Sequence, residues 1–299
     1  MAIQTKAIKQ KINSIGNLKK VTKTMELISI AKMRKMISFV KERESYSTAI
    51  LRLLNNLSRE RHLEHPFLKE GKGKKHLVVL FTSDRGLCGQ YHVRLNDSVK
   101  KMKVKYQDNL ELITVGKEAI RIAERNKVNV NKSFNALTGQ LKSNTLNEIT
   151  EIVTSEFLAG KVESVSILFN SFFSIMNYIT KNVVVLPLHV SLYNDYFEID
   201  EDKIFNGSKT DLTYYPYKLE PDEESVLDKL LPELFFTTLE HFALESLATE
   251  HSARMVAMQQ ASDNASRLQD KLLYDYNKAR QAAVTQEITE IVNTTLAVS

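Results

Sequence analysis

Proline and glycine, the residues that interrupt helices, are missing from long stretches at both ends of the chain. All five prolines lie between Pro66 and Pro232, and the last of the nine glycines is Gly207. The first 65 residues therefore contain no proline, and the final 92 contain no glycine. In a helix interior proline costs roughly 3 kcal/mol and glycine about 1 kcal/mol relative to alanine. This distribution predicts two long helices that flank a domain of mixed structure.

The N-terminal segment has the apolar spacing of a helix from about Ile3 to Leu57. Apolar residues recur every three or four positions, at Ile8, Ile12, Ile15, Leu18, Val21, Met25 and Ile28. A second apolar stretch, Ile50 to Leu57, continues the pattern. A single helix of this length cannot bury its apolar stripe, so it needs a partner helix.

The C-terminal segment, from about Asp222 to the end, predicts that partner. Its expected seam contains Met258, Ala261, Ala265, Leu268 and Leu272, and it continues through Tyr276, Ala279 and Ala283 after one extra step of four. Such a stutter would locally unwind a supercoil. Pro232 predicts a break or kink near Leu231, or a later helix start. Antiparallel pairing of the two ends is the simplest way to bury both stripes; the alternative is two separate coiled-coil arms.

Between the ends, short apolar runs alternate with helical patterns. Strands are expected at His76–Phe81, Leu110–Val115, Val128–Phe134, Val165–Phe169 and Ile179–Leu188, and helices at Tyr91–Tyr106, Lys117–Arg125 and Thr145–Leu158. This alternation predicts βαβ units and a mainly parallel sheet, with a loop containing short strands over Asn194–Tyr217. The fold class is therefore α/β, with a terminal helix over 1–65, a central Rossmann-like domain over 75–216, and a second terminal helix over 222–299 that pairs with the first.

Charge is concentrated at the N-terminal end. Residues 1–62 contain 14 Lys and Arg against four acids, a net of +10, so the rest of the chain sums to −5 (5 − 10). A basic helix can face nucleic acid, an anionic membrane surface or an acidic protein, or it can simply be solvated. One cysteine, Cys88, allows no disulfide within the chain. Neither a signal-peptide core nor a stretch of 18 apolar residues is present, so membrane association is expected only through a partner or through charge.

No catalytic, cofactor-binding or metal-binding constellation is predicted. The loop Asp84–Gly89 follows a strand and precedes a helix, where α/β domains often bind phosphate, but it matches no nucleotide-binding pattern. A tight turn with a buried structural thiol at Cys88 is the favoured interpretation over a reactive thiolate. The scattered histidines form no complete metal site. The basic helix has almost no aromatic residues for stacking on bases, which disfavours nucleic acid.

Three stretches of the sequence resemble a known family. They are VTKTMELISIAKMRK at Val21–Lys35, SDRGLCG at Ser83–Gly89, and the long run LESLATEHSARMVAMQQASDNASRLQDKLLYDYNKARQAAVTQEITEIV at Leu244–Val292. Together they look like the gamma subunit of the rotary F-type ATP synthase of bacteria, and the resemblance covers the whole chain. It implies a non-catalytic central-stalk rotor, without cofactor, that couples proton-driven rotation of the c ring to ATP synthesis at the beta subunits. The implied shaft turns inside three alpha and three beta subunits, and the central domain meets the epsilon subunit and the c ring.

The resemblance also implies contact residues. Met25 and Arg254 fall where the family's shaft passes the acidic lever loops of beta. Contacts with a beta catch loop would come from Arg280, Gln281, Thr285 and Glu287, and a foot near the c ring or epsilon from Tyr217 and Glu220. The resemblance further implies a peripheral protein on the cytoplasmic face of the bacterial inner (plasma) membrane. It would be attached to the membrane only through its complex, and no nucleic acid is expected as a partner. The chloroplast forms carry a redox-controlled cysteine pair, which a chain with Cys88 alone lacks.

Other function classes stay open on the sequence alone. They are an unrelated coiled-coil adaptor, a nucleic-acid-binding coiled coil and a phosphate-binding α/β enzyme with long arms. Co-purification separates them, because alpha and beta subunits, nucleic acid or a bound nucleotide would each identify a different class.

Overall fold

The computed structural model describes residues 2–60, 65–137, 143–189 and 219–298. It divides into two compact units: unit 1 contains residues 1–30 and 254–299, and unit 2 contains residues 31–253. Both long helices contribute to both units, and each unit is described by itself. The predicted loop Asn194–Tyr217, which includes the candidate residue Tyr217, lies outside the described residues.

Unit 2 is built around a five-stranded sheet in the order β3-β2-β1-β4-β5. The strands are β1 (Lys75–Phe81), β2 (Leu110–Val115), β3 (Asn129–Phe134), β4 (Val162–Phe172) and β5 (Tyr178–Leu186). The first four are parallel, and β5 returns antiparallel to β4 through a short hairpin. The predicted α/β class and mainly parallel sheet are therefore confirmed.

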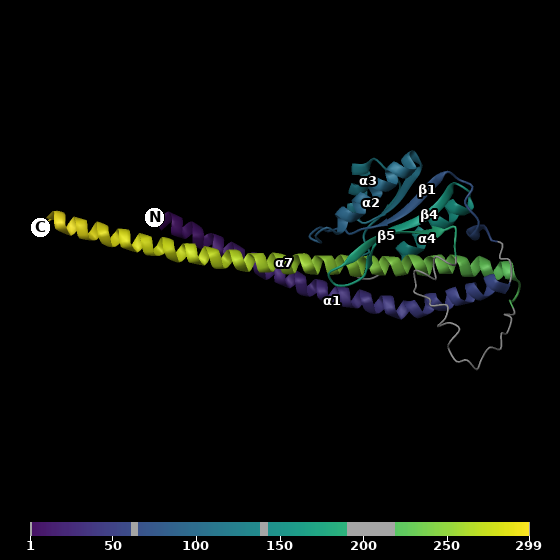
Figure 1. Cartoon of the computed structure of the whole chain (residues 1–299), viewed down its shortest axis with the longest axis horizontal. Coiled ribbons are helices and arrows are strands. Elements are labelled where there is room, and N and C mark those ends of the chain that lie inside the picture. The colour runs from purple at the N-terminus through teal and green to yellow at the C-terminus, as the bar shows by residue number, and fades with distance from the viewer. Residues whose placement is uncertain (1, 61–64, 138–142, 190–218, 299) are drawn as a thin grey trace, which may run out of the picture. The chain divides into compact units, whose positions relative to one another are not determined.

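Helices cover both faces of this sheet (Figure 1). On one face, α2 (Tyr91–Tyr106) and α3 (Lys117–Asn126) pack through Leu95, Val99 and Ile122 against strand residues such as Val78 and Leu80. On the other face, α4 (Ser143–Leu158) packs through Leu146, Ile149, Val153 and Phe157. Strand residues alternate between the two clusters, because successive side chains of a strand point to opposite faces.

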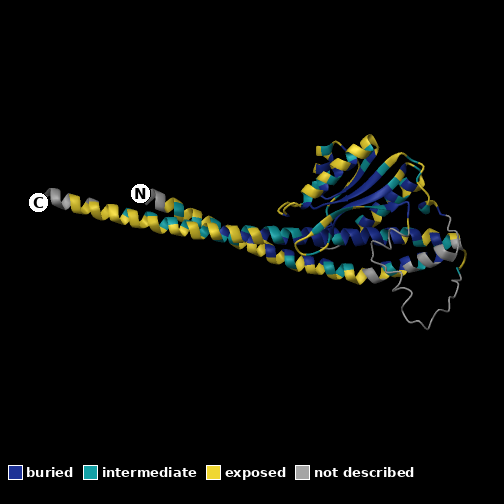
Figure 2. Cartoon of the chain, viewed as in Figure 1, coloured by how far each residue is buried: buried dark blue, intermediate teal, exposed yellow. Residues whose placement is uncertain are grey.

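The two long helices are α1 (Ala2–Glu60) and α7 (Glu223–Val298). Within unit 2 they join the cluster that contains α4, with Met36, Leu51 and Leu54 from α1 and Leu227 through Ala248 from α7. Between Thr237 and Ser252 nearly every residue of α7 is buried, and Figure 2 shows this segment in dark blue. No described helix has an apolar stretch of the kind that crosses a membrane.

The break and the later helix start predicted at Pro232 are wrong, while the alternative of a kink there stays a prediction. Helix α7 begins at Glu223 and continues unbroken through Pro232. Proline costs a helix interior roughly 3 kcal/mol, because it lacks an N–H and its ring crowds the preceding turn. The surrounding residues Leu227, Leu231, Leu234 and Phe235 are almost completely buried. Burial of each such side chain contributes about 1.5–3 kcal/mol, so tertiary packing outweighs the proline.

In unit 1, α1 and α7 run antiparallel, with the N- and C-termini at the same end (Figure 1). A methyl group built on Gly16 would lie 3.5 Å from Nε2 of Gln269. The less exposed positions of the two helices follow unbroken steps of three and four: Ile8, Ile12, Ile15, Lys19, Thr22, Glu26 and Ser29 in α1, and Met255, Met258, Ser262, Ala265, Gln269, Leu272, Tyr276, Ala279 and Ala283 in α7. The antiparallel coiled coil is confirmed.

The residues assigned to its seam need correction. Leu18, Val21 and Ile28 are about half exposed and Leu268 is exposed, while Thr22, Glu26, Ser29 and Ser262 lie buried instead. The stutter in α7 is also absent, because Gln269 rather than Leu268 occupies the seam. A left-handed pair needs 3.5 residues per turn. The apolar series through Leu18 and Val21 contains three consecutive steps of three, which would overwind the helix.

We expect Gly116→Ala to destabilise unit 2 by at least about 2 kcal/mol. Gly116 has φ +96 at the start of α3, and a Cβ there would lie 2.8 Å from the carbonyl oxygen of Thr82. Gly86→Ala is the matched control, since a Cβ at Gly86 meets nothing within 4 Å. Urea unfolding measures both variants, and equal stabilities would contradict the expectation.

Burial lowers the pKa of His241, in the buried part of α7, from 6.5 to about 4. The unfolded chain binds a proton at this histidine below its ordinary pKa, whereas the folded chain resists it. Stability should therefore fall as the pH drops from about 6.5 toward about 4, by about 2 kcal/mol at roughly pH 5. Urea unfolding of wild type and His241→Gln near pH 7.5 and near pH 5 measures this. If both proteins lose the same stability, the loss originates elsewhere.

Candidate functional site

The carboxyl edge of the sheet is the usual location of a ligand site in this fold class. In open α/β sheets, ligands bind beyond the carboxyl ends of the strands, where the strand order reverses. Here that point lies between β1 and β4. The loop after β1 carries the Ser83–Gly89 motif, and β4 turns directly into β5.

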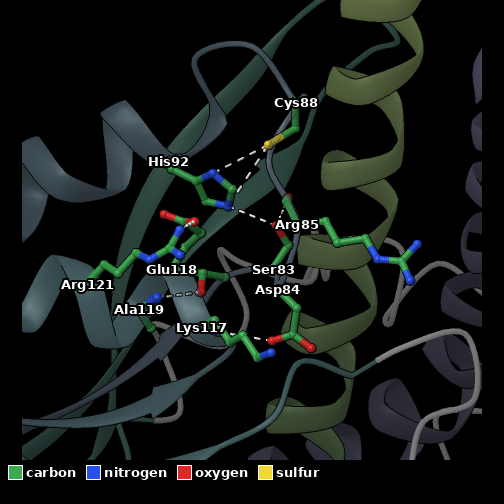
Figure 3. Close-up of polar contacts among 10 residues, drawn as sticks. Ser83, Asp84, Arg85, Cys88, His92, Lys117, Glu118, Ala119 and Arg121 are labelled. Atoms are coloured by element: carbon green, nitrogen blue, oxygen red, sulfur yellow. Dashed lines mark hydrogen bonds and ion pairs between the residues drawn. The ribbon is translucent and has the colours of Figure 1, made fainter. Parts of the chain in front are cut away.

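The backbone N–H groups in the first turn of α3 donate hydrogen bonds to residues at the end of β1 and in this loop (Figure 3). The backbone N–H of Lys117 donates to Oδ1 of Asp84 at 3.0 Å, and that of Ala119 donates to Oγ1 of Thr82 at 2.8 Å. Glu118 N–H donates to the carbonyl of Ser83 at 3.2 Å. The Asp84 carboxylate also accepts from Ala136 N–H at 3.2 Å. The protein's own carboxylate therefore occupies the position at which a phosphate would bind a helix N-terminus.

Cys88 is buried, as predicted. Its Sγ lies 3.4 Å from Nδ1 of His92, and Nε2 of His92 lies 2.9 Å from Oγ of Ser83. The Ser83 hydroxyl donates to the carbonyl of Arg85 at 2.8 Å. Its Oγ consequently accepts from His92 Nε2–H, which leaves Nδ1 to accept from the thiol. These hydrogen bonds hold the loop in place and occupy the polar groups of Ser83, Cys88 and His92.

Side chains from α2, β4 and α7 fill the remaining space at the strand-order reversal. Asn170 donates to the carbonyl of Tyr91 at 3.0 Å, and the Tyr91 hydroxyl lies 2.7 Å from Oγ of Ser246. Burial raises the pKa of Tyr91 well above its usual value, so its hydroxyl stays neutral. Phe169 and Phe242 stack with ring centroids 4.6 Å apart. The usual ligand position of this fold is packed with the protein's own residues.

The described residues contain no group of three His, Cys, Asp or Glu side chains that could hold a metal ion.

The helix pair of unit 1 exposes apolar side chains beside basic ones. Leu18 is 51% exposed, Val21 54% and Leu27 57%, while Thr22, Glu26 and Ser29 are turned inward. The Thr22 hydroxyl donates to backbone carbonyls, and Glu26 pairs with Lys23 at 2.9 Å. Placing polar residues in the seam and apolar ones outside is the reverse of the usual pattern. Such a surface indicates a protein that is covered by a partner.

The C-terminal part of α7 continues this character. Val284, Ile288, Ile291 and Val292 are all about half exposed or more. Figure 2 shows α7 changing from dark blue in its buried segment to mostly yellow toward the C-terminus. A helix end with so many exposed aliphatic side chains also fits a surface that contacts another protein.

Most of the residues that the resemblance selected lie on these surfaces. Met25 is 38% exposed on α1, and Arg254 is partly buried on α7. Three further candidates, Arg280, Gln281 and Glu287, are exposed, and Oγ1 of Thr285 donates to the carbonyl of Gln281 at 3.0 Å. These four share neighbouring turns of α7.

The structure does not bring all the candidates together. Glu220 is exposed in unit 2, just before the cis bond to Pro221. Sequence reasoning missed the inward-facing Thr22, Glu26 and Ser29. A strict alternation of four and three residues, counted onward from Ile8, would have found them.

The comparisons with known proteins agree along the whole chain. The model of the ATP synthase family matches residues 4–298. The ATP synthase gamma chain of Halothermothrix orenii is 34% identical over 287 residues, covering 95% of this chain and 96% of that one. The ATP synthase gamma chain of Xanthomonas axonopodis pv. citri is 33% identical over 296 residues, covering 97% and 98%.

Solved structures share the fold at lower identity. A chain of the Euglena gracilis mitochondrial ATP synthase, from the OSCP/F1/c-ring part, matches with a TM-score of 0.67 at 17% identity, over 100% of this chain and 95% of that one. A chain of the central stalk and c-ring of the Tetrahymena thermophila mitochondrial ATP synthase matches with a TM-score of 0.59 at 19% identity, over 81% and 99%. On the sequence match alone, which is above 30% identity over nearly the full length, this chain belongs to the ATP synthase gamma-chain family.

Proposed function

We propose that this chain is the central-stalk rotor of an ATP synthase. It couples proton-driven rotation of the c ring to ATP synthesis at the catalytic beta subunits. It acts by mechanical contact and contributes no catalytic residue, since the nucleotide chemistry takes place in beta. Membership of the gamma-chain family supports this role.

The observation that carries the proposal is the outward apolar surface of unit 1. A soluble helix pair normally turns its aliphatic residues toward its seam. Here Leu18, Val21 and Ile28 face outward, while Thr22, Glu26 and Ser29 occupy the neighbouring seam positions. An exposed apolar stripe is stable only when a sleeve covers it, and a ring of alpha and beta subunits is such a sleeve. Apolar contact has no preferred direction, so it permits rotation.

We propose specific contacts within that sleeve. Met25 and Arg254 meet the acidic lever loops of beta, and Arg280, Gln281, Thr285 and Glu287 meet its catch loop. The exposure of Met25, Arg280, Gln281 and Glu287 is consistent with such contacts. The basic N-terminal end of α1, with Lys20 and Lys23 exposed, would attract acidic loops without forming a fixed lock.

The α/β domain then serves as the foot of the rotor. We place epsilon and the c ring against this end, with Glu220 and Tyr217 as candidate contacts. The complex sits on the cytoplasmic face of the bacterial inner membrane and transports protons, and this chain joins the membrane only through the complex. Relatives of bacterial origin support that location.

Reconstitution with purified alpha and beta subunits tests the rotor role. We expect the three proteins to form a stoichiometric complex whose ATP hydrolysis depends on this chain. Omitting the chain should lower the rate of ATP hydrolysis at least about tenfold, which corresponds to an activation free energy higher by about 1.4 kcal/mol. A complex that hydrolyses ATP equally well without the chain would contradict the rotor role. Binding of nucleic acid that weakens as salt is raised would instead favour a nucleic-acid-binding coiled coil.

The catch-loop contact gives a second prediction. Changing both Arg280 and Gln281 to alanine should lower ATP hydrolysis of the reconstituted complex about tenfold, as expected for loss of an interface hot spot. Both residues are exposed, so thermal unfolding of the free chain should not change. Lys278→Ala, at another exposed position on the same turn, is the control. Equal effects from the control and the double variant would remove these residues from the contact.

A further inference from the structure

The tip of the hairpin between β4 and β5 carries an unusual set of exposed apolar side chains. Phe173 is 75% exposed, Met176 is 77% exposed, and Ile175 and Ile179 are each about half exposed. We call these four residues the hairpin patch. Single exposed apolar residues are ordinary on protein surfaces, but four within seven positions form a cluster that needs a reason.

The geometry of the turn does not require apolar residues at its tip. Ser174 and Asn177 exchange two backbone hydrogen bonds of 2.9 and 3.3 Å, which makes Ile175 and Met176 a two-residue loop. Such loops usually contain Gly, Asn or Asp, because the favoured turns require positive φ. Neither Ile175 nor Met176 has positive φ. Two large apolar residues at this position are therefore better explained by what they contact than by the turn they form.

The hairpin patch is held in place within unit 2. The hydroxyl of Ser252 in α7 donates to the carbonyl of Ile175 at 2.6 Å. On the other side of the hairpin, Arg94 of α2 donates to the carbonyl of Tyr178 at 2.7 Å. Anchors from two helices present the patch in one orientation, which lowers the entropy lost when a partner binds.

Positive charge lies beside the patch, and a further apolar residue lies at the same edge of the sheet. The guanidinium of Arg94 stacks 4.4 Å above the ring of Tyr178. The loop after β1 ends at the same sheet edge, because β1 and β4 are neighbouring parallel strands. In that loop Arg85 and Leu87 are exposed, and Leu87 has φ +65, a strained value for a leucine. The Asp84 carboxylate in the same loop is used by backbone N–H groups of α3 and of Ala136.

We propose that the hairpin patch is a docking surface for a partner segment that presents aliphatic side chains bordered by carboxylates. The apolar tip would supply the contact area, and Arg94 would select acidic residues at its rim. This inference rests on the proposed function, since it requires an assembly in which unit 2 meets another subunit. It adds a contact surface on the α/β domain to the surface already described on unit 1.

Photo-crosslinking in the reconstituted complex tests whether the patch is covered. A photoreactive phenylalanine analogue replaces Met176 in one variant and Val104 in the control. Val104 is 75% exposed on α2, so the two probes are equally accessible in the free chain. We expect a crosslink to a partner subunit from position 176 at several times the yield from position 104, at an acidic segment of that subunit. Equal yields, or crosslinks to basic segments only, would overturn the proposal.

Charge substitution tests the chemistry of the partner. Met176→Glu should weaken the complex about tenfold more than Met176→Lys, because only the former places like charges together. The difference should shrink as salt is raised. Equal weakening by both variants would refute the carboxylate rim. Met176 is exposed, so both variants should fold, which thermal unfolding of the free chain checks.

The docking surface and the rotor role can fail independently in these experiments. If the wild-type chain restores ATP hydrolysis but position 176 gives no crosslink above the control, the docking surface is refuted and the rotor role stands. If the chain does not assemble with alpha and beta subunits at all, the rotor role fails first.

Discussion

Burial of the first third of α7 is the interaction on which unit 2 depends. From Leu227 to Ala248 this helix shares one apolar cluster with the sheet, α4 and α1. Its burial from Thr237 to Ser252 is nearly complete, so it acts as a central element of the core and not as an attached arm. The same packing carries the helix through Pro232 and keeps His241 uncharged. A helix fixed this firmly can transmit force to the domain around it, which is what the proposed rotor role requires.

The helix pair of unit 1 follows the opposite logic. Its seam contains Thr22, Glu26 and Ser29 in α1 and Ser262 and Gln269 in α7, so the pair gains less from burial than an aliphatic seam would give. Several aliphatic residues, among them Leu18, Val21 and Ile28, are instead turned outward. This arrangement lowers the stability of the isolated pair and supplies a surface for a sleeve. One continuous helix thus serves two environments, its own core in unit 2 and a proposed partner in unit 1.

At the carboxyl edge of the sheet, the protein's own side chains occupy the region where this architecture often binds nucleotides. Asp84 occupies the N-terminus of α3, and Tyr91 and Asn170 bridge the point where strand order reverses. These bonds keep the edge rigid, and the hairpin patch projects from this rigid edge. The positions where other α/β domains bind small molecules here lie beneath the surface that we propose for protein contact.

The sequence by itself determined the existence and limits of most elements. The lack of proline and glycine at both ends, together with the three-and-four spacing, predicted α1 and α7, and the alternation in the middle predicted the βαβ order. Local signals suffice there, because helix and strand formation depends on nearby residues and on one buried face. The SDRGLCG loop and the family motifs were also readable from the sequence.

Tertiary structure alone decided which face each helix buries and what happens at its irregular positions. Leu18, Val21 and Leu268 were assigned to the wrong face, because hydrophobicity alone does not give the pitch of the helix pair, and the break expected at Pro232 is absent. In unit 1, two helices can wind around each other only at 3.5 residues per turn, and this pitch overrides the more apolar series. At Pro232, burial of the neighbouring leucines outweighs a local penalty. The hairpin patch was likewise invisible in sequence, since an apolar Ile-Met pair at a turn is recognised only when its exposure is known.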